Sequence, residues 1–196
     1  AGLAPLRSAD LLGAILVQFP QRFRRSEGSL RHLGRLLGRL EGWPVVVEVR
    51  HASWGGDDVT AWFEDRDVGW CIVDQPRVGS STVAPVARAT STIGYLRLHG
   101  RNVDNWFRQD AGRDARYDYL YTEDELAALA NAALETSTRT EELFVVQNNH
   151  FRGQALANAL QMRHLIDGGS HPAPPELVRA YPELETVTTV DQARLF

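Results

Sequence analysis

Polar residues follow five short apolar runs in this sequence, at the points where the runs end. If the runs are parallel strands, their carboxyl ends meet at one edge of a sheet, which is the ligand face of parallel α/β folds. We therefore predict that carboxylates, guanidinium groups, imidazoles and amides share that edge. The residues concerned are Gln18, Glu48, Arg50, His51, Asp74, Arg97, His99, Arg101, Asn148 and Asn149.

Charged residues in two of these runs alternate with apolar ones. Side chains alternate across a strand, so Glu48 shares a face with Arg50, and Arg97 shares a face with His99. An inward charge needs a partner or a ligand, because an unpaired buried charge is costly. We predict that Arg97 lies among acids, with Glu48 or Asp74 nearest, and that removing Arg97 costs roughly 3–5 kcal/mol of stability.

Two interpretations of this polar edge are open. In one, the charged residues form an internal network of ion pairs. In the other, they bind an anionic or polyhydroxylated ligand, and Arg50, Arg97 and Arg101 are its forked hydrogen-bond donors. Further contacts to the ligand are predicted from Gln18, His51, Trp54, Asn148 and Asn149.

Three residues of the edge are candidates for proton transfer. His99 has an ordinary pKa near neutrality and suits a general acid or base, although a plain hydrogen-bond donor is the equal alternative. Glu48 and Asp74 come from adjacent runs and resemble the carboxylate pair of glycosidases, a weak pattern. The predicted catalytic set is Glu48, Asp74 and His99.

Several other chemistries lack their sequence patterns. All 21 basic residues are arginine, which excludes a Schiff-base lysine and a Walker lysine within this chain. No HExxH or HxxxH spacing, Gly-x-Gly-x-x-Gly loop or Gly-x-Ser-x-Gly elbow is present, so we predict no metal and name no cofactor. Trp54, Trp106 and Phe107 lie in predicted loops after strand ends, where an aromatic ring can stack on a base or a sugar ring.

The apolar runs alternate with segments of helical period. Leu33 and Leu37 belong to one helical face, Asp57 and Asp58 can cap a short helix, and Thr122 with Glu125 forms a capping box. A last helix is predicted over about residues 152–166. Repeated strand–helix units favour a parallel sheet, either doubly wound or part of a (βα)8 barrel. The predicted strands are Gly13–Phe19, Pro44–Val49, Gly69–Val73, Ile93–Leu98 and Leu143–Gln147.

Length and composition predict one globular domain. The chain has 196 residues, a net charge of -4 and 43% apolar residues, which disfavours a non-specific nucleic-acid coat protein. No apolar run is long enough for a membrane helix, and Cys71 is the only cysteine, so we expect a cytoplasmic protein. We place a partial barrel domain at residues 1–170 and a Pro-containing tail at 171–196; the oligomeric state is left open.

The blocks at the strand ends resemble the YecE-like family, domain of unknown function 72, over about residues 11–166. The resemblance implies a TIM-barrel-like (βα)8 fold and names no activity. The matching blocks are LGAILVQFP at 12–20, VEVRHASW at 47–54, the run ending at Asp74, YLRLHGRN at 95–102, RYDYLY at 116–121, Asn148-Asn149, Gly153-Gln154-Ala155 and Asn158-Ala159.

The sequence departs from the family pattern at its beginning. Family members begin with three strands that carry a Gly-Thr-Ser-Gly-aromatic block, an Asn-x-Thr-Phe-Tyr block and a lysine, and these blocks are missing here. We expect a truncated product that keeps the last five βα units. Unpaired edges at Gly13–Phe19 and Leu143–Gln147 then favour poor solubility or self-association.

Three functions remain open from the sequence. The first is an enzyme or binding protein for a phosphorylated, sugar or nucleotide-like ligand. The second is a nucleic-acid-binding or repair-like module that stacks bases on Trp54 and Trp106. The third is a non-catalytic scaffold whose polar edge is structural. The dependence of binding on salt separates the first two, because each phosphate contact steepens it.

Overall fold

The computed structural model describes residues 2–77, 80–106, 108, 110 and 113–190. The chain divides into two compact units. Unit 1 comprises Ala1–Val73, Arg77–Leu96 and Glu135–Phe144, and unit 2 comprises Asp74–Pro76, Arg97–Leu134 and Val145–Phe196. We describe the contacts of each unit separately.

Five strands form one sheet in their order along the chain. Neighbours β1 and β2 run parallel, with Gln18 opposite Glu48, and β2 runs parallel to β3. A doubly wound sheet reverses its strand order at a switch point, whereas this order has no reversal, so the fold is α/β and singly wound. The strands are β1 (Ile15–Gln18), β2 (Val45–Glu48), β3 (Gly69–Asp74), β4 (Ile93–Leu98) and β5 (Glu142–Gln147), which confirms all five predicted runs.

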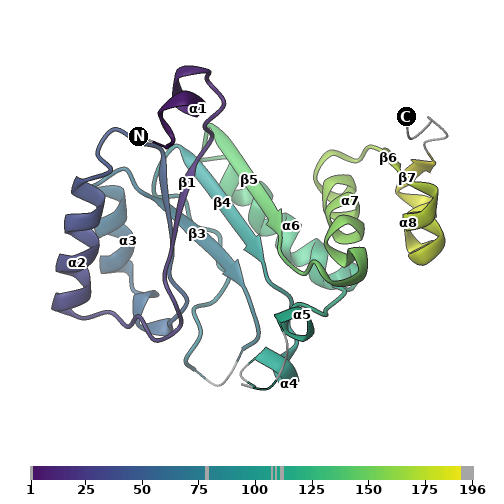
Figure 1. The fold of residues 1–196 in the computed structure, drawn as a ribbon, viewed down its shortest axis with the longest axis horizontal. Coiled ribbons are helices and arrows are strands. Elements are labelled where there is room, and N and C mark those ends of the chain that lie inside the picture. Colours follow the sequence, from purple (N-terminus) through teal and green to yellow (C-terminus); the bar gives the residue numbers. More distant parts are fainter. Residues whose placement is uncertain (1, 78–79, 107, 109, 111–112, 191–196) are drawn as a thin grey trace. The chain divides into compact units, whose positions relative to one another are not determined.

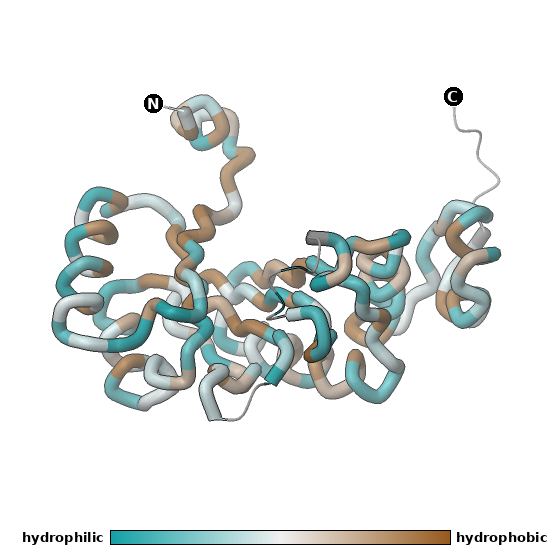
Figure 2. The backbone as a smooth tube through the Cα atoms, turned by 60° about the horizontal axis from the view of Figure 1, so that its bottom comes forward, coloured by the Kyte–Doolittle hydropathy of each residue, from teal (hydrophilic) through white to brown (hydrophobic). Residues whose placement is uncertain are grey.

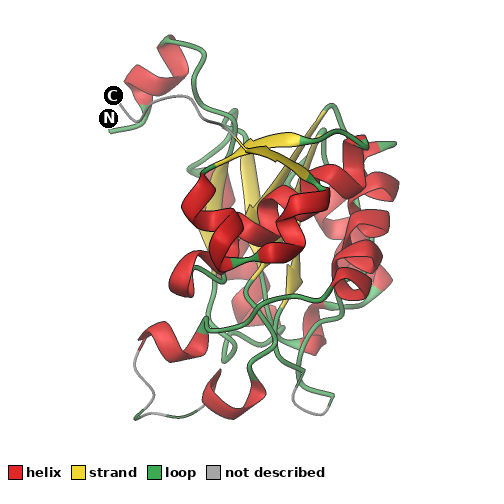
Figure 3. Ribbon diagram, turned by 90° about the vertical axis from the view of Figure 1, so that its right-hand side faces the viewer, coloured by secondary structure: helices red, strands yellow, loops and turns green. Residues whose placement is uncertain are grey.

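Helical segments separate β1 from β2, β2 from β3 and β4 from β5 along the chain, and Figure 3 draws helices in red and strands in yellow. The predicted helix over residues 152–166 is confirmed as α7, preceded by one short 3-10 turn. The segments up to this point are α1 (Ala4–Ser8), α2 (Glu27–Gly38), η1 (Ala52–Trp54), α3 (Asp57–Glu64), α4 (Val103–Trp106), α5 (Arg113–Arg116), α6 (Glu123–Ser137), η2 (Phe151–Gly153) and α7 (Gln154–Asp167).

Local sequence explains where α2 and α3 of unit 1 begin. Ser26 caps α2, because its side chain accepts from Ser29 N while the Ser29 hydroxyl accepts from Ser26 N. The leucines of α2 recur among polar residues (Figure 2), and Leu33 and Leu37 are buried. Helix α3 lies beside α2 (Figure 1) and is capped by Gly56, so the predicted caps Asp57 and Asp58 lie inside its first turn instead.

The capping box at the start of α6 is confirmed. Glu125 N donates to Thr122 Oγ1 at 3.3 Å, and Thr122 N donates to Glu125 Oε2 at 3.0 Å. This arrangement satisfies two backbone donors at the beginning of the helix. It also fixes the Glu125 carboxylate at the amino end of α6, where it contributes to the site described below.

The two faces of the sheet in unit 1 bury different side chains. Val46, Cys71 and Val73 pack together with Leu16 and Tyr95 on one face. On β3 the alternate residue Trp70 turns to the other side and meets Phe63 of α3, with ring centroids 5.3 Å apart. This alternation decides the direction of each polar residue at a strand end.

The predicted tail contains folded segments that the sequence did not reveal. They are β6 (His171–Ala173), α8 (Pro175–Ala180), η3 (Pro182–Thr186) and β7 (Thr188–Val190), and β6 pairs with β7 in parallel. Ala173, Val178 and Leu184 pack with Ala157 and Leu160 of α7 as a core cluster within unit 2. Such short elements show no hydrophobic period, which explains why the sequence predicted a tail here. Residues 191–196 lie outside the described residues.

Within the described residues, no helix combines the length and apolar character needed to cross a membrane.

Candidate functional site

The predicted polar residues lie at strand ends, as expected, but they are divided between the two units. Gln18 and Glu48 are the last residues of β1 and β2, and Arg50, His51 and Trp54 follow in unit 1. The remaining residues belong to unit 2: Asp74, Arg97, His99, Arg101, Asn148 and Asn149. The convergence of both groups on one ligand stays a prediction.

In unit 1, Glu48 forms an ion pair with Arg50. The Arg50 Nε and Nη2 atoms each lie 2.7 Å from Glu48 Oε1. The Glu48 side chain is completely buried, and that of Arg50 is 12% exposed. A buried carboxylate held this way is stabilised in its charged form, so Glu48 fits the ion-pair interpretation of the sequence.

His51 and Trp54 have packing and capping contacts in unit 1. His51 Nδ1 accepts from Ser53 N at 3.1 Å and caps η1, and burial, followed by the charge of Arg24, lowers the pKa of His51. Trp54 is completely buried, its indole donates to Phe23 O at 2.8 Å, and its ring stacks on Phe23. The predicted ligand contact of Trp54 stays a prediction.

In unit 2, Asp74 is held by Arg101. Asp74 follows Val73 and turns to the opposite face of β3 from that residue. Arg101 Nη2 donates to Asp74 Oδ1 and Arg101 Nε donates to Oδ2, both at 2.9 Å. The Tyr121 hydroxyl also donates to Oδ2, at 2.7 Å. Both oxygens of the buried carboxylate are therefore engaged, and the expected position of Arg97 among acids stays a prediction.

The same arginine contacts a second carboxylate. Arg101 Nη1 donates to Glu125 Oε1 at 2.9 Å, and the Tyr119 hydroxyl donates to the same oxygen at 2.7 Å. Tyr121 completes the cluster, because its hydroxyl accepts from Gly100 N at 2.8 Å. We call these five residues the Arg101 cluster: Asp74, Arg101, Tyr119, Tyr121 and Glu125. The cluster joins the ends of β3 and β4 to the start of α6.

The protonation states within the Arg101 cluster follow from its burial and contacts. Burial would raise the pKa of Glu125, but hydrogen bonds from Thr122 N, Tyr119 and Arg101 lower it below its ordinary value. Burial and the Glu125 carboxylate raise the pKa of Tyr119 to about 12. Burial and Asp74 raise the pKa of Tyr121 still further. Two carboxylates thus share one guanidinium, and the cluster has no positive charge to spare for an anion.

A second cluster in unit 2 is centred on the side-chain amide of Asn148. Arg97 Nη2 donates to Asn148 Oδ1 at 3.4 Å, and Asn148 Nδ2 lies 3.0 Å from His99 Nδ1. Because the amide nitrogen donates, His99 Nδ1 is an acceptor and the proton of the neutral imidazole is on Nε2. Alternation along β4 puts Arg97 and His99 on the same face of the strand, as the sequence predicted.

Aromatic rings surround this amide and bury His99. The His99 ring lies 5.8 Å from Trp106 and 6.2 Å from Tyr117, and Tyr117 lies 5.0 Å from His150. His99 is completely buried, whereas the His150 side chain is 45% exposed. We call these six residues the Asn148 cluster: Arg97, His99, Trp106, Tyr117, Asn148 and His150. Phe107, the third loop aromatic considered, lies outside the described residues.

His150 is the accessible imidazole of the Asn148 cluster. Its Nδ1 lies 3.1 Å from Asn148 O, a carbonyl that can only accept, so Nδ1 carries a proton. Its Nε2 lies 3.7 Å from Asp114 Oδ1, a contact that becomes attractive when the imidazole is protonated. The cluster therefore brings the Arg97 guanidinium and the exposed His150 imidazole to the same residue, Asn148.

Asn149 has a structural position. It is completely buried, and its Nδ2 donates to Tyr119 O and to Asn158 Oδ1, each at 2.8 Å. These bonds connect the end of β5 to the segment before α6 and to α7. The predicted ligand contact of Asn149 stays a prediction, while Asn148 next to it is partly exposed.

Among the described residues, no three His, Cys, Asp or Glu side chains are grouped closely enough to hold a metal ion. Sequence reasoning did not place Trp106, Tyr117 and His150 beside His99, nor Tyr119, Tyr121 and Glu125 beside Asp74. The capping box and the alternating tyrosines at 117–121 were visible in the sequence, but their partners come from strands distant along the chain.

Known proteins of similar sequence and structure share this fold. UPF0759 protein YunF of Bacillus subtilis (strain 168) is 31% identical over 174 residues, covering 84% of this chain and 61% of that protein. A DUF72 family protein of Enterococcus faecalis V583 superposes with a TM-score of 0.78 at 30% identity, covering 84% of this chain and 62% of that one. A DUF72 family protein of Thermotoga maritima MSB8 superposes with a TM-score of 0.76 at 34% identity, covering 84% of this chain and 62% of that one.

The chain spans about three-fifths of the length of these relatives. The profile of a single family, described as "Protein of unknown function DUF72", matches residues 1–179. The order of its strands, the polar residues that end them and these matches agree, and the chain belongs to the DUF72 family.

Proposed function

We propose that the Asn148 cluster binds a small anionic, oxygen-rich ligand such as a phosphorylated sugar. The observation that carries the proposal is the Asn148 amide, which holds Arg97 on one side and His99 on the other. An amide that contacts a guanidinium on one side and an imidazole on the other orients both groups. A phosphate or carboxylate of a ligand can then accept hydrogen bonds from Arg97.

The charges of the two clusters support this choice of site. Arg101 lies between two carboxylates, Asp74 and Glu125, and its charge is already compensated. Arg97 contacts the Asn148 amide, and the exposed side chain of His150 belongs to the same cluster. Of the three arginines predicted as ligand donors, Arg97 is the one we assign to the ligand, because its cluster also holds partly exposed amide and aromatic side chains. Arg50 is held by Glu48.

The aromatic residues of the cluster support a ligand with a ring. Trp106 and Tyr117 meet edge to face at 5.8 Å, and both are partly exposed. Aromatic faces stack on sugar rings and bases, while Tyr and His tips donate hydrogen bonds to hydroxyl groups. His99 lies behind Trp106 and Tyr117, so we give it the role of orienting Asn148, and proton transfer by His99 stays a prediction.

A nucleic-acid-binding module is the second candidate and has less support. This hypothesis uses Trp54 and Trp106 as stacking surfaces for bases, and Trp54 is completely buried. One remaining aromatic group suits a single ring better than a run of bases. The net charge of -4 gives no broad positive field for a phosphate backbone.

We also propose that the five strands are part of a (βα)8 barrel and correspond to its last five βα units. The sequential order of the strands and the greater length of the DUF72 relatives support this assignment. Ligands of such barrels bind at the carboxyl ends of the strands, where the Asn148 cluster lies. The activity of a whole DUF72 protein, and a cytoplasmic location as expected from the single buried Cys71, are proposed on the same basis.

A thermal-shift and calorimetric screen of the whole chain tests the proposal. The probes are glucose 6-phosphate, inorganic phosphate, glucose and adenosine monophosphate. We expect a phosphorylated probe to bind and Arg97→Ala to weaken it by about tenfold or more, since a charge-assisted hydrogen bond contributes about 1.5–3 kcal/mol. Arg179→Ala changes an exposed arginine of α8 and is the matched control. Equal binding by both variants contradicts the proposal.

The dependence of binding on salt separates the two candidate functions. A single phosphate group gives a shallow dependence, whereas several backbone contacts of a nucleic acid give a steep one. The same titration at two salt concentrations, with glucose 6-phosphate and with a single-stranded oligonucleotide, measures this difference. Tight, salt-sensitive binding of the oligonucleotide alone favours the second candidate.

A further inference from the structure

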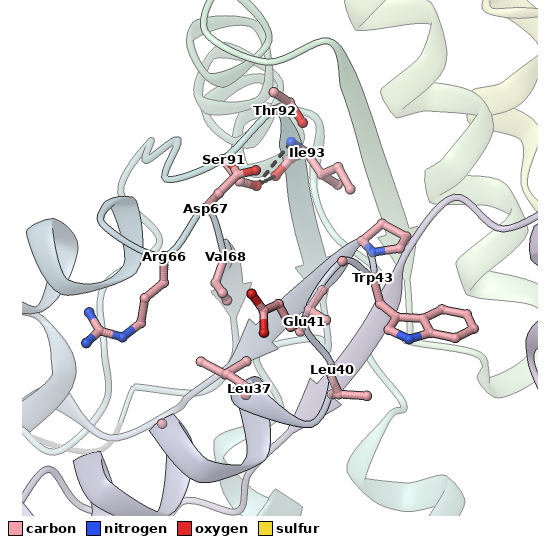
Figure 4. A pocket seen from close by; sticks show the side chains of 15 residues that line it. Leu37, Leu40, Glu41, Trp43, Arg66, Asp67, Val68, Ser91, Thr92 and Ile93 are labelled. Atoms are coloured by element: carbon pink, nitrogen blue, oxygen red, sulfur yellow. Dashed lines mark hydrogen bonds between the residues drawn. The ribbon is translucent and has the colours of Figure 1, made fainter.

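A second cavity lies in unit 1, at the amino ends of β2, β3 and β4. Its volume is about 720 Å³, within the range of pockets that hold small molecules. The end of α2, the turn that leads into β2 and the turn after α3 form its walls (Figure 4). Its lining includes Leu37, Gly38, Glu41, Val45, Asp67 and Val68.

The charged side chains of this cavity are not balanced. Figure 4 shows the Glu41 carboxylate directed into the space beside Val68, with Asp67 on the opposite wall. Within the part of the chain that the structure describes, neither carboxylate takes part in an ion pair or a side-chain hydrogen bond. Arg66 points away from the space, because its guanidinium lies over the Trp62 ring at 4.1 Å and donates to Trp62 O.

The inner wall is apolar. Leu37, Val45 and Val68 are each less than 9% exposed. Trp43 lies on the rim, where the guanidinium of Arg7 at 4.8 Å from its ring holds it in place. A ligand that fits this lining has an apolar body and one positively charged end.

We propose that this cavity binds a small organic cation, an amine with an aromatic or aliphatic body, at a site separate from the Asn148 cluster. The ammonium group lies at the Glu41 carboxylate, and the apolar body lies against Leu37, Val45 and Val68. A carboxylate above an apolar wall discriminates a cation from its neutral analogue.

Ligand-detected NMR on the whole chain tests this site, with phenethylamine as the cationic probe and 2-phenylethanol as its neutral analogue. We expect phenethylamine to bind about tenfold more tightly, in line with one charge-assisted contact. Glu41→Gln removes one carboxylate and is expected to weaken phenethylamine about fivefold, the effect of one partly exposed ion pair. Glu27→Gln, at the exposed start of the same helix, is the control and leaves binding unchanged.

A second variant fills the cavity. A Cβ added at Gly38 meets no atom within 4 Å, and leucine is a better helix former than glycine, so Gly38→Leu is expected to fold. We expect Gly38→Leu to abolish binding of phenethylamine while the melting temperature stays equal or rises. Equal binding of the amine and the alcohol, absence of binding by the amine, or unchanged binding in both Glu41→Gln and Gly38→Leu overturns the proposal.

Discussion

Arg97 and Arg101 are four residues apart in the same block of sequence, yet they lie in different surroundings. Arg101 is bound by two carboxylates from β3 and α6, and its side chain is one-third exposed. Arg97 contacts the neutral amide of Asn148. The two side chains are of the same type, but the contacts around them differ. The comparison shows that the surrounding side chains, rather than the presence of arginine, separate a structural cluster from a candidate binding site.

The largest expected effect is loss of stability when the Arg101 cluster is broken. Arg101→Ala leaves the buried Asp74 carboxylate without its cation, and we expect the free energy of unfolding to fall by about 3 kcal/mol, the lower end of the range for a buried pair. Urea unfolding measures this change. Arg179→Ala, which breaks an exposed pair with Glu176, is expected to cost less than about 1 kcal/mol. Equal losses for the two variants show that Arg101 does not stabilise the buried carboxylate.

A smaller effect is expected from the tyrosine hydroxyl that supports Asp74. Tyr121→Phe removes a donor to Asp74 and an acceptor for Gly100 N, so we expect a loss of about 2 kcal/mol. Tyr181→Phe is the matched control, because its hydroxyl donates only to Arg152 O in a more exposed position. A Tyr121→Phe variant as stable as Tyr181→Phe shows that the hydroxyl does not stabilise the buried carboxylate.

The dependence of stability on pH sharpens the comparison further. The pKa of Glu125 is lower in the folded chain than its ordinary value near 4.5, so the folded state holds the proton less tightly than the unfolded state. The contribution of Glu125 is therefore present above pH 4.5 and is lost as the pH falls through the folded value. Chemical unfolding between pH 7 and pH 3 measures it. Glu125→Gln is expected to show a shallower acid decline than the native chain.

Glu123→Gln provides the control for this experiment. Glu123 is exposed in the same first turn of α6 and does not belong to the Arg101 cluster. We expect its acid decline to match that of the native chain. The same slope for Glu125→Gln and the native chain would show that the Arg101 cluster does not hold the Glu125 carboxylate in its charged form.

The sequence predicted the strands well because each is a local pattern. All five apolar runs form strands, and the capping box at Thr122 and Glu125 begins α6 as expected. The alternation of Arg97 with His99 also followed from the period of a strand. By contrast, the elements after residue 170 are too short to show a period, and their apolar residues pack on α7.

The partners of the polar residues could not be predicted in the same way. Asp74 ends a strand whose other face packs with the apolar core, so alternation turns its carboxylate toward Arg101 and Tyr121. Glu125, the other carboxylate on Arg101, is distant along the chain and comes from a different element. Trp54 follows a strand end, as the sequence suggested, but it is buried against Phe23. Such contacts depend on tertiary packing that no spacing along the chain reveals.

The most direct test of the account compares ligand affinity in Arg97→Ala and Asn148→Ala with affinity in the native chain, at a temperature where all three are folded. Isothermal titration with glucose 6-phosphate is the measurement. The account predicts that each variant weakens binding by about tenfold or more, because Asn148 orients the Arg97 guanidinium that binds the phosphate. Affinity that is unchanged in both variants, or absent from the native chain for every phosphorylated probe, would contradict it.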